Sequence, residues 1–221
     1  MPAASRPRWV VVAVAVALAC LAGFTALTLA IYGHGPLLSV DVAVEHTFAS
    51  HRQHWLVQVF SVETQTASFY VAGPLLLATS AVLAWAQRSW RALLLGTAAV
   101  VVLGVCVGTG KEVIGRSRIP FAANAFGDGG TSYPSGHTTT AVVAAGCLVL
   151  LLERWLSRAA RRWCLAGVVV YSVVTGISRV YLRAHWFTDV LAGWLLGTAI
   201  VCLLAVAWLG WPRLAPPAPA R

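Results

Sequence analysis

Charged residues are scarce in this sequence. They make up 10% of its 221 residues, whereas hydrophobic residues make up 59% and the mean hydropathy is +0.77. A soluble domain usually carries about 25% charged residues, so this composition cannot build a surface that faces water throughout. Lipid must cover much of the molecule, which excludes a water-soluble protein and predicts an integral membrane protein of one domain.

Negative charge and lysine are rarer still. Asp and Glu together number 7, and Lys111 is the only lysine among 16 basic residues. We assign the net charge of +9 mainly to membrane orientation, and it gives no case for a nucleic-acid partner. The single lysine directly follows an uncharged stretch, Ala92–Gly110, at a position where a compact ammonium group would be useful.

Cysteine motifs are also missing. The five cysteines lie in or at the edge of apolar runs, and no two are arranged as Cys-x-x-Cys. This pattern gives no indication of a disulfide framework or a zinc site, and we expect the thiols to pack as small hydrophobic groups. They are Cys20, Cys106, Cys147, Cys164 and Cys202.

Long apolar runs are what the sequence does have. Six of them approach the ~20 residues that a helix needs to cross a bilayer. Only helices and closed barrels satisfy the backbone in lipid, and these runs do not alternate, so we predict an all-α polytopic membrane protein with six transmembrane helices. The first run is too long for the apolar part of a signal peptide. The runs are Trp9–Tyr32, Phe69–Ala86, Ala92–Gly110, Thr138–Leu152, Trp163–Ile177 and Val190–Trp211.

Two segments fall outside this pattern. Gly33–Ala67 is long enough for a helix on the outer membrane surface, with Trp55 as an interfacial anchor. Residues 212–221 are rich in Pro and Ala, and we predict a disordered cytoplasmic tail. Residues 1–211 then form one six-helix membrane domain.

The basic residues predict which side faces the cytoplasm. Six helices place both termini on one side, and ten basic residues flank that side against six on the other. By the positive-inside rule, the side of the termini is cytoplasmic. Three polar clusters, Lys111–Arg118, Ser132–Thr140 and Ser178–Asp189, then fall on the outer face, where we expect them to form one pocket.

Several residues in these clusters suit a phosphate group. Lys111, Arg118 and Arg179 are fixed cations, with arginine offering a planar fork and lysine a point charge. Ser135 is placed as the N-cap of a helix. Gly136, which has no Cβ, would present backbone N–H groups to an anion at the positive end of that helix.

Two histidines complete the chemistry. His185 and Asp189 are four residues apart, so on a helix they share a face and Asp189 accepts a hydrogen bond from Nδ1. Nε2 of His185 is then left as a nucleophile, and His137 is able to protonate a leaving oxygen. Each signal alone is more often structural, but together they predict a two-histidine phosphoryl-transfer site.

Three motifs carry a resemblance to a known family. The sequence resembles the type 2 phosphatidic acid phosphatase superfamily, which shares its helical core with vanadium haloperoxidases and glucose-6-phosphatase. The family usually has Pro directly after the arginine of its first motif, whereas here Ile119 comes before Pro120. The motifs are Lys111-x6-Arg118, Pro134-Ser135-Gly136-His137 and Ser178-Arg179-x5-His185-x3-Asp189.

The resemblance implies a role for each motif residue. It implies that His185 attacks phosphorus to form a phosphohistidine, that Asp189 holds His185, and that His137 protonates the leaving group and then activates water. It also implies that no metal or other cofactor is needed, because cations do the work of Mg²⁺. The phosphoryl oxygens would be bound by Lys111, Arg118, Ser135, the Gly136 N–H and Arg179.

We therefore predict a cell-membrane lipid phosphate or pyrophosphate phosphatase that acts at the outer face. Undecaprenyl pyrophosphate, phosphatidate and phosphatidylglycerol phosphate are all candidate substrates, and the oligomeric state is open. Two other classes compete with this one. The six lipid-spanning helices disfavour a vanadate-dependent haloperoxidase. The set of His137, His185 and Asp189 disfavours a non-catalytic lipid-binding or transport protein, which has no use for a nucleophile.

Three further histidines have a metal-binding alternative. His51 and His54 are three residues apart and would share a helical face, a spacing that suits a metal. His46 would point well round the helix from them, and no carboxylate or cysteine completes the set. An amphipathic helix at the membrane interface explains them better.

Three charged residues near the motifs also allow two interpretations. Glu63 lies near the start of the second apolar run, where we favour a structural hydrogen bond over catalysis at the pocket rim. Arg116 and Arg183 flank motif residues. Either one contacts a second phosphate or a lipid headgroup, or it extends to the membrane surface without a specific partner.

Overall fold

The predicted apolar runs all form helices. The computed structural model describes residues 8–33, 36–119 and 130–210, so the predicted tail at 212–221 lies outside the described residues. Within these ranges the chain is all-α, as predicted, with one isolated bridge between Ser117 and Thr131. The helices are α1 Arg8–Tyr32, α2 Leu37–Ser50, α3 His54–Thr66, α4 Phe69–Ala86, α5 Arg91–Ile114, α6 Gly136–Leu152, α7 Arg158–Tyr181 and α8 Phe187–Gly210.

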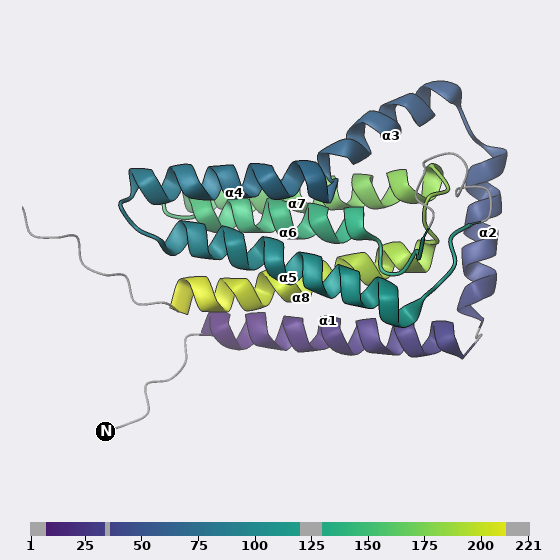
Figure 1. Cartoon of the computed structure of the whole chain (residues 1–221), viewed down its shortest axis with the longest axis horizontal. Coiled ribbons are helices and arrows are strands. Elements are labelled where there is room, and N and C mark those ends of the chain that lie inside the picture. Colours follow the sequence, from purple (N-terminus) through teal and green to yellow (C-terminus); the bar gives the residue numbers. More distant parts are fainter. Residues whose placement is uncertain (1–7, 34–35, 120–129, 211–221) are drawn as a thin grey trace, which may run out of the picture.

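Six of the helices lie side by side and a seventh closes one end. Figure 1 shows α1 and α4 to α8 running along the long axis, with α2 across the end of this bundle. α8 packs mainly against α1 and α6, and α6 also packs against α7, α4 and α5. The two helices in the middle, α6 and α8, each begin at the end that α2 covers.

Five helices in the described part of the chain are long and apolar enough to cross a membrane. They are α1, α4, α5, α7 and α8, and each has at least 18 residues. α6, with 17 residues, is a shorter apolar helix. The prediction of a multi-pass α-helical membrane protein is confirmed, whereas the count of six spans stays a prediction.

The short helix α6 is the most enclosed of the bundle. Ten of its residues are buried, including the polar run Thr138–Thr140. Two glycines of α8 let it approach closely: a Cβ on Gly193 would lie 2.9 Å from the Ser135 carbonyl oxygen, and one on Gly197 would lie 2.8 Å from Cβ of Val142. Small residues at such crossings allow close helix packing in membranes. The start of α6 is thereby fixed against the first turns of α8.

Large apolar side chains cover the outside of the bundle. Val12, Leu29, Val82 and Trp85 are among many that are largely exposed in the isolated chain. A membrane protein turns such side chains to lipid, so this exposure agrees with the composition. All five cysteines are free, and Cys147 alone is buried.

Residues at the helix ends explain where several helices begin and stop. Ser68 and Ser157 are N-caps whose hydroxyls accept from the backbone N–H of Tyr70 (3.3 Å) and Ala160 (3.1 Å). Gly115 ends α5 in the left-handed region, at φ +60°, which costs a glycine little. This turn directs the following residues, including Arg116 and Arg118, back toward α7 and α8.

The segment between the first two long helices differs from the prediction. One surface helix was predicted over Gly33–Ala67, but the structure has two, α2 and α3, with a break at 51–53. Residues 34–35 lie outside the described residues. Trp55, the predicted interfacial anchor, is exposed on α3. The break lets α2 lie over the end of the bundle while α3 leads back to α4 (Figure 1).

Candidate active site

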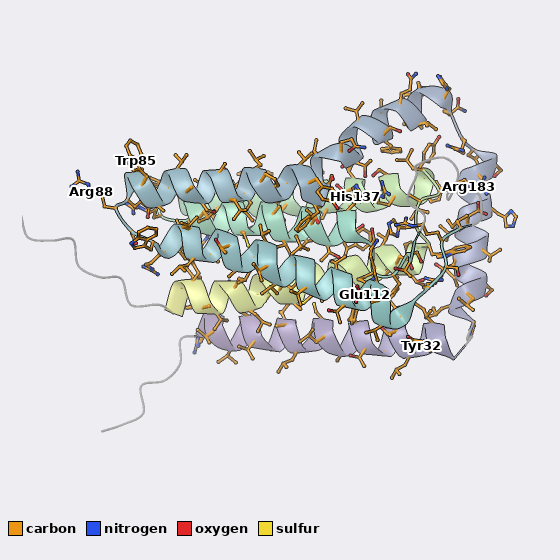
Figure 2. The ribbon with its side chains drawn as sticks, viewed as in Figure 1. Tyr32, Trp85, Arg88, Glu112, His137 and Arg183 are labelled. Carbon is orange, nitrogen blue, oxygen red and sulfur yellow. The ribbon has the colours of Figure 1, made fainter. Side chains whose placement is uncertain are left out.

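One cavity at the α2 end of the bundle holds residues from all three polar clusters. It has a volume of about 520 Å³ and lies among the ends of α4, α5 and α6, the loop into α6 and the turn between α7 and α8. In Figure 2, His137 lies in this half of the molecule, far from Trp85 at the other end. The predicted site residues that line the cavity are Lys111, Arg118, Gly136, His137 and His185.

The first cluster supplies two cations from the end of α5. Lys111 lies in the last turn of the helix, and its Nζ donates to the Thr131 carbonyl at 3.3 Å. Arg118 follows the Gly115 turn, and its Nη1 donates to the Ala184 carbonyl at 2.8 Å. These two carbonyl contacts hold the cations at the cavity wall, where the sequence predicted that they would bind phosphate.

The second cluster begins α6. Ser135 occupies the predicted N-cap position, but its hydroxyl makes no capping bond to the backbone. Its Oγ instead pairs with Thr138 Oγ1 at 2.9 Å, and its backbone N–H donates to the Asp189 carbonyl at 3.0 Å. The predicted N-cap position is thus confirmed, and the buried hydroxyl of Ser135 is satisfied by a neighbouring side chain and not by the backbone. Gly136 and His137, one step along, face the cavity.

The third cluster places His185 beside Asp189, though by another route than predicted. His185 lies in the turn before α8, and Asp189 lies in the first turn of that helix. The prediction of a shared helical face is wrong, since His185 is not helical. The turn still brings Nδ1 of His185 to 3.4 Å from Oδ2 of Asp189. The same Oδ2 accepts from the Trp186 backbone N–H at 3.0 Å, which fixes the carboxylate under the ring.

The surroundings of His185 keep its imidazole neutral. The side chain is almost fully buried, and this burial lowers the pKa of His185 well below its ordinary value of 6.5. The charges of Arg179, Arg118 and Lys111 lower the pKa further. A neutral imidazole with its Nδ1 turned to a carboxylate leaves Nε2 as the available nitrogen. This Nε2 lies 3.4 Å from Nη1 of Arg118, at the cavity.

Arg179 supports the cavity from a buried position. It lies in the last turn of α7, and 3% of the residue is exposed. Its Nη1 donates to Oγ1 of Thr64 in α3 at 3.1 Å. Arg179 does not line the described cavity wall, yet it is close enough to depress the pKa of His185. Its predicted contact with phosphate stays a prediction.

Comparisons with known proteins bear on this arrangement. The PAP2 superfamily model matches residues 90–212, which is more than half of the chain and contains all three clusters. The chain belongs to the PAP2 superfamily. Phosphatidylglycerophosphatase B of Bacillus subtilis is 30% identical over 173 residues, covering 75% of this chain and 82% of that protein. An undecaprenyl-diphosphatase of Sulfolobus acidocaldarius is 41% identical over 69 residues, covering 31% of this chain and 30% of that protein.

A solved structure extends the likeness to nearly the whole fold. The crystal structure of a transmembrane PAP2-type phosphatidylglycerolphosphate phosphatase from Bacillus subtilis matches with a TM-score of 0.81 and 28% sequence identity. The match covers 90% of this chain and 98% of that one. Together these relatives indicate that this PAP2 protein is a membrane lipid phosphatase.

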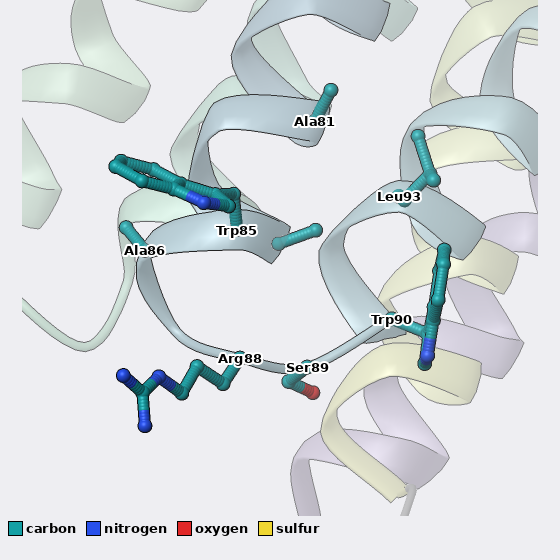
Figure 3. Close-up of a pocket in the computed structure, with 8 residues that line it drawn as sticks. Ala81, Trp85, Ala86, Arg88, Ser89, Trp90 and Leu93 are labelled. Atoms are coloured by element: carbon teal, nitrogen blue, oxygen red, sulfur yellow. The ribbon is translucent and has the colours of Figure 1, made fainter.

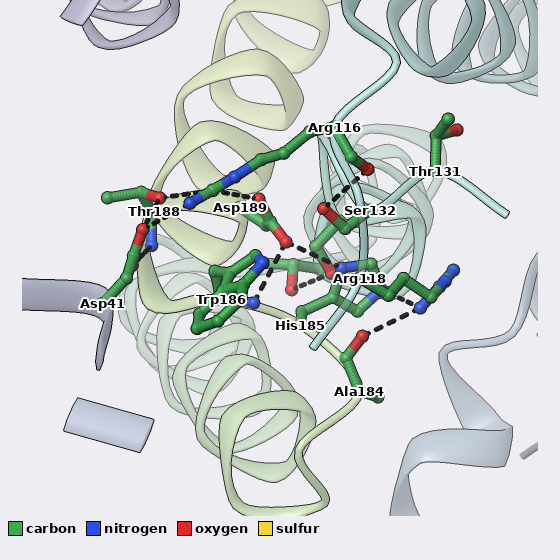
Figure 4. Close-up of polar contacts among 12 residues, drawn as sticks. Asp41, Arg116, Arg118, Thr131, Ser132, Ala184, His185, Trp186, Thr188 and Asp189 are labelled. Carbon is green, nitrogen blue, oxygen red and sulfur yellow. Dashed lines mark hydrogen bonds and ion pairs between the residues drawn. The ribbon is translucent and has the colours of Figure 1, made fainter. Parts of the chain in front are cut away.

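Arg116 and Arg183 have partners that the sequence did not predict. Arg116 forms ion pairs of 2.6 Å with both Asp41 and Asp189, and Arg183 pairs with Glu45 (Figure 4 shows the Arg116 pairs). Neither arginine of this PAP2 protein therefore extends to the membrane surface without a specific partner, whereas contact with a second phosphate or a lipid headgroup stays a prediction. Buried carboxylates nearby are stronger partners than lipid or water.

Glu63 and two histidines of the surface segment, His51 and His54, form hydrogen bonds with neighbouring protein groups. Glu63 accepts a hydrogen bond from Thr175 Oγ1 at 2.7 Å, which is the predicted structural role. His51 contacts its own helix end, at Ser50 and the Thr47 carbonyl. His54 contacts Gln58 at 3.1 Å. In the described part of the chain, no group of three metal-ligating side chains is present.

Asp41 and Glu45 lie at the end of the bundle that holds the cavity, and the sequence analysis did not single them out. They lie four residues apart on α2, and both are buried against the arginines named above. A signal was available. Only 7 acidic residues occur in the chain, and two of them share a face of a segment that is otherwise mostly apolar. Nothing in the sequence states which arginines they meet.

A larger cavity at the opposite end of this PAP2 protein has no comparable chemistry. Its volume is about 760 Å³, and it lies at the turn between α4 and α5 (Figure 3). Trp85, Arg88, Ser89 and Trp90 line it together with alanines and Leu93, without any histidine or carboxylate. The candidate active site is therefore chosen by its grouping of imidazoles and cations and not by its size.

Proposed function

We propose that this PAP2 protein hydrolyses a phosphomonoester or pyrophosphate group of a membrane lipid through a phosphohistidine on His185. The observation that carries the proposal is the shared cavity of His137, His185, Lys111 and Arg118. Asp189 beside Nδ1 directs the other ring nitrogen, Nε2, toward that cavity. This set supplies a nucleophile, a proton donor and fixed positive charge, which phosphoryl transfer requires.

The first half-reaction transfers the phosphoryl group to the enzyme. Nε2 of His185 attacks phosphorus as the bond from phosphorus to the leaving oxygen breaks. His137 gives its proton to that oxygen, so the lipid leaves as an alcohol or as a monophosphate. Lys111, Arg118 and Arg179 stabilise the charge on the other phosphoryl oxygens, helped by the backbone N–H of Gly136 at the start of α6.

The second half-reaction releases inorganic phosphate. His137, now neutral, takes a proton from water, and the resulting hydroxide attacks the phosphohistidine. The bond between phosphorus and Nε2 breaks, and the electron pair returns to the imidazole. Asp189 remains the acceptor for Nδ1–H throughout, which balances the positive charge that the ring carries while it is phosphorylated. No metal ion takes part in either step.

The cavity wall supports a lipid as substrate. Beside the charged residues it has an apolar side made by Phe69 of α4 and by Leu103 and Val107 of α5. Gly104 and Gly108 of α5 also line that side, and because they have no side chains they do not fill the cavity. A headgroup at the cations would thus have its tail beside apolar helices. Phosphatidylglycerol phosphate, undecaprenyl pyrophosphate and phosphatidate remain the candidates, and relatives named for the first two support them.

We also place the active site on the outer face of the membrane, with both termini in the cytoplasm. The end of the bundle opposite the site carries the connections 87–90 and 153–157, and Arg88, Arg154 and Arg158 lie at or beside them. The excess of basic residues at that end supports a cytoplasmic location. Substrates would then be lipids presented in the outer leaflet.

Phosphate release from purified protein in detergent tests the function. The three candidate lipids are offered in turn, with EDTA present, and we expect at least one to release inorganic phosphate. Vanadate should inhibit, because a trigonal-bipyramidal vanadate bonded to Nε2 of His185 resembles the transition state. Activity that is lost in EDTA and restored by Mg²⁺ would refute the mechanism.

The same preparation separates the two competing classes. Bromide oxidation by hydrogen peroxide with vanadate present, but without phosphatase activity, would indicate a haloperoxidase. Tight binding of a lipid phosphate without any turnover would indicate a lipid-binding protein. We expect neither result.

A further inference from the structure

The helix α2 contacts the active site through a buried carboxylate. Asp41 has 1% of its surface exposed and lies on α2, the helix that crosses the end of the bundle with the cavity (Figure 1). We propose that Asp41 is a positioning residue: it balances the charge of Arg116, so that Asp189 keeps its full negative charge toward His185. This inference rests on the function proposed above, and it concerns a residue outside the matched range 90–212.

Arg116 is shared between two carboxylates. Its Nη2 donates to Oδ2 of Asp41 and its Nη1 donates to Oδ1 of Asp189, both at 2.6 Å (Figure 4). The other oxygen of Asp189, Oδ2, is the one beside Nδ1 of His185. The four side chains therefore form a continuous chain of contacts from α2 to the nucleophile.

The balance of charge among Asp41, Arg116 and Asp189 decides how well Asp189 accepts the hydrogen bond from His185 and stabilises positive charge on its ring. Two carboxylates and one guanidinium leave a net charge of −1 next to His185. If Asp41 were neutral, Arg116 would turn its whole charge on Asp189, and the pair would be close to neutral. Asp189 would then be a weaker acceptor for Nδ1–H and would stabilise less of the positive charge that develops on the imidazole during attack.

Asp41 also fixes the start of α8. Its Oδ1 accepts from the backbone N–H of Thr188 at 2.8 Å, and its Oδ2 accepts from the Thr188 hydroxyl at 2.6 Å. That N–H is one of the first-turn donors that have no partner inside a helix. Thr188 directly precedes Asp189, so a carboxylate on α2 holds the backbone from which Asp189 projects.

Glu45 provides a matched control on the same helix. It lies one turn beyond Asp41, it is also buried, and it pairs with Arg183 in the turn that contains His185. Both ion pairs tie α2 to that turn. Only Asp41 shares its arginine with Asp189, whereas no contact joins Glu45 or Arg183 to that carboxylate among the described side chains.

The test compares Asp41→Asn with Glu45→Gln. Asparagine keeps the size of the side chain and removes its charge. We expect kcat of Asp41→Asn to fall by about 10- to 100-fold, with KM within about 3-fold of wild type, because the change acts on the transition state. Glu45→Gln should keep kcat within about 3-fold, because its ion pair with Arg183 does not include Asp189.

Inhibition constants distinguish positioning from a loss of packing. Vanadate bonds to His185, so its inhibition constant should rise in Asp41→Asn in parallel with the loss of kcat. Inorganic phosphate is held by the cations and the Gly136 N–H without a bond to His185, so its inhibition constant should stay near that of wild type. Equal weakening of both inhibitors in both variants would overturn the proposal, because it would mean that α2 serves only to cover the site. Wild-type kcat in a folded Asp41→Asn protein would overturn it as well.

Two further variants keep the test decisive. His185→Ala is assayed in parallel: if it retains activity, the proposed function fails, and if it is inactive while Asp41→Asn is fully active, only the role of Asp41 fails. Should Asp41→Asn not fold, Thr188→Val removes the hydroxyl that joins Asp41 and Arg116 without changing charge. It should show the same split between vanadate and phosphate, with a loss of about 3- to 10-fold in kcat, and an unchanged kcat would refute the proposal.

Discussion

The two ends of the bundle use the same residue type in different ways. At the end covered by α2, Arg116 and Arg179 are at least nine-tenths buried and donate to side chains of other helices. At the opposite end, Arg88 and Arg154 are exposed, and Arg154 donates to Gln87 and lies over the ring of Trp155. The first group is held in place by specific partners, whereas the second is exposed at the surface of the protein. Position in the fold, and not the abundance of arginine, therefore separates the buried arginines beside the candidate site from the exposed ones at the other end.

The two cavities sharpen this comparison most. His185→Ala should reduce phosphate release by at least ~10³-fold, because it removes the nucleophile. Trp85→Ala, in the larger cavity at the other end, should leave the rate within about 2-fold, since no reacting group is near. Phosphate release is measured on both variants after gel filtration shows a folded protein. An active His185→Ala enzyme would contradict the mechanism.

Two arginines of α7 provide the next contrast. Arg179→Gln removes a buried cation beside His185 and should lower kcat/KM by about 10²- to 10³-fold, the usual effect of losing a donor to a developing charge. Arg158→Gln, in the first turn of the same helix, should change kcat/KM by less than about 2-fold. Steady-state assays on one lipid phosphate compare them. An equal loss of kcat/KM in both variants would contradict the view that only the arginine at the cavity end takes part in the reaction.

The location of the two ends can be measured with single cysteines. In a background without the five native cysteines, Ser50→Cys marks the α2 end and Ser157→Cys marks the start of α7; both positions are exposed. A thiol reagent that does not cross membranes should label position 50 on intact cells and position 157 only after lysis. The opposite pattern would place the active site in the cytoplasm and exclude an outer-leaflet substrate. Asp128, a further position for such a label, lies outside the described residues.

The smallest expected effect separates the packed part of α7 from its lipid-facing part. A Cβ on Gly176 would lie 2.5 Å from the Trp194 ring and 2.7 Å from Val190, so Gly176→Ala should lower Tm by about 2 to 12 °C. Gly167 is exposed and has no neighbour within 4 Å, so Gly167→Ala should leave Tm unchanged or raise it slightly. Thermal unfolding in detergent measures both. A tolerated alanine at 176 would show that the helices pack less closely than described.

Much of the site followed from the sequence because its residues lie near the ends of long helices. Helix ends alternate between the two membrane faces, so the order of the runs alone placed Lys111, His137 and His185 at one end. The contact of His185 with Asp189 was predicted for a helix and occurs across a turn, because several backbone paths bring residues four apart together. Their roles in phosphoryl transfer stay predictions.

The partners of Arg116 and Arg183 could not be predicted in the same way. Asp41 and Arg116 are 75 residues apart, and their meeting depends on how α2 folds over the bundle after the break at 51–53. Spacing rules describe contacts within a helix or turn, and no local pattern fixes the direction in which a surface segment returns. The sequence left both arginines open between a phosphate or headgroup contact and plain extension to the membrane surface, and only the structure supplies their carboxylate partners.

The sequence by itself determined that lipid surrounds the protein, that the chain is helical, and which motifs it carries. Few charges and long apolar runs require lipid around an all-α chain, since only satisfied backbones are stable there. Only the tertiary structure decided which charges are neutralised within the protein and which remain at the cavity. The reason is physical: a buried ion pair needs two groups within about 3 Å, and that distance is set by the packing of helices that lie far apart in the sequence.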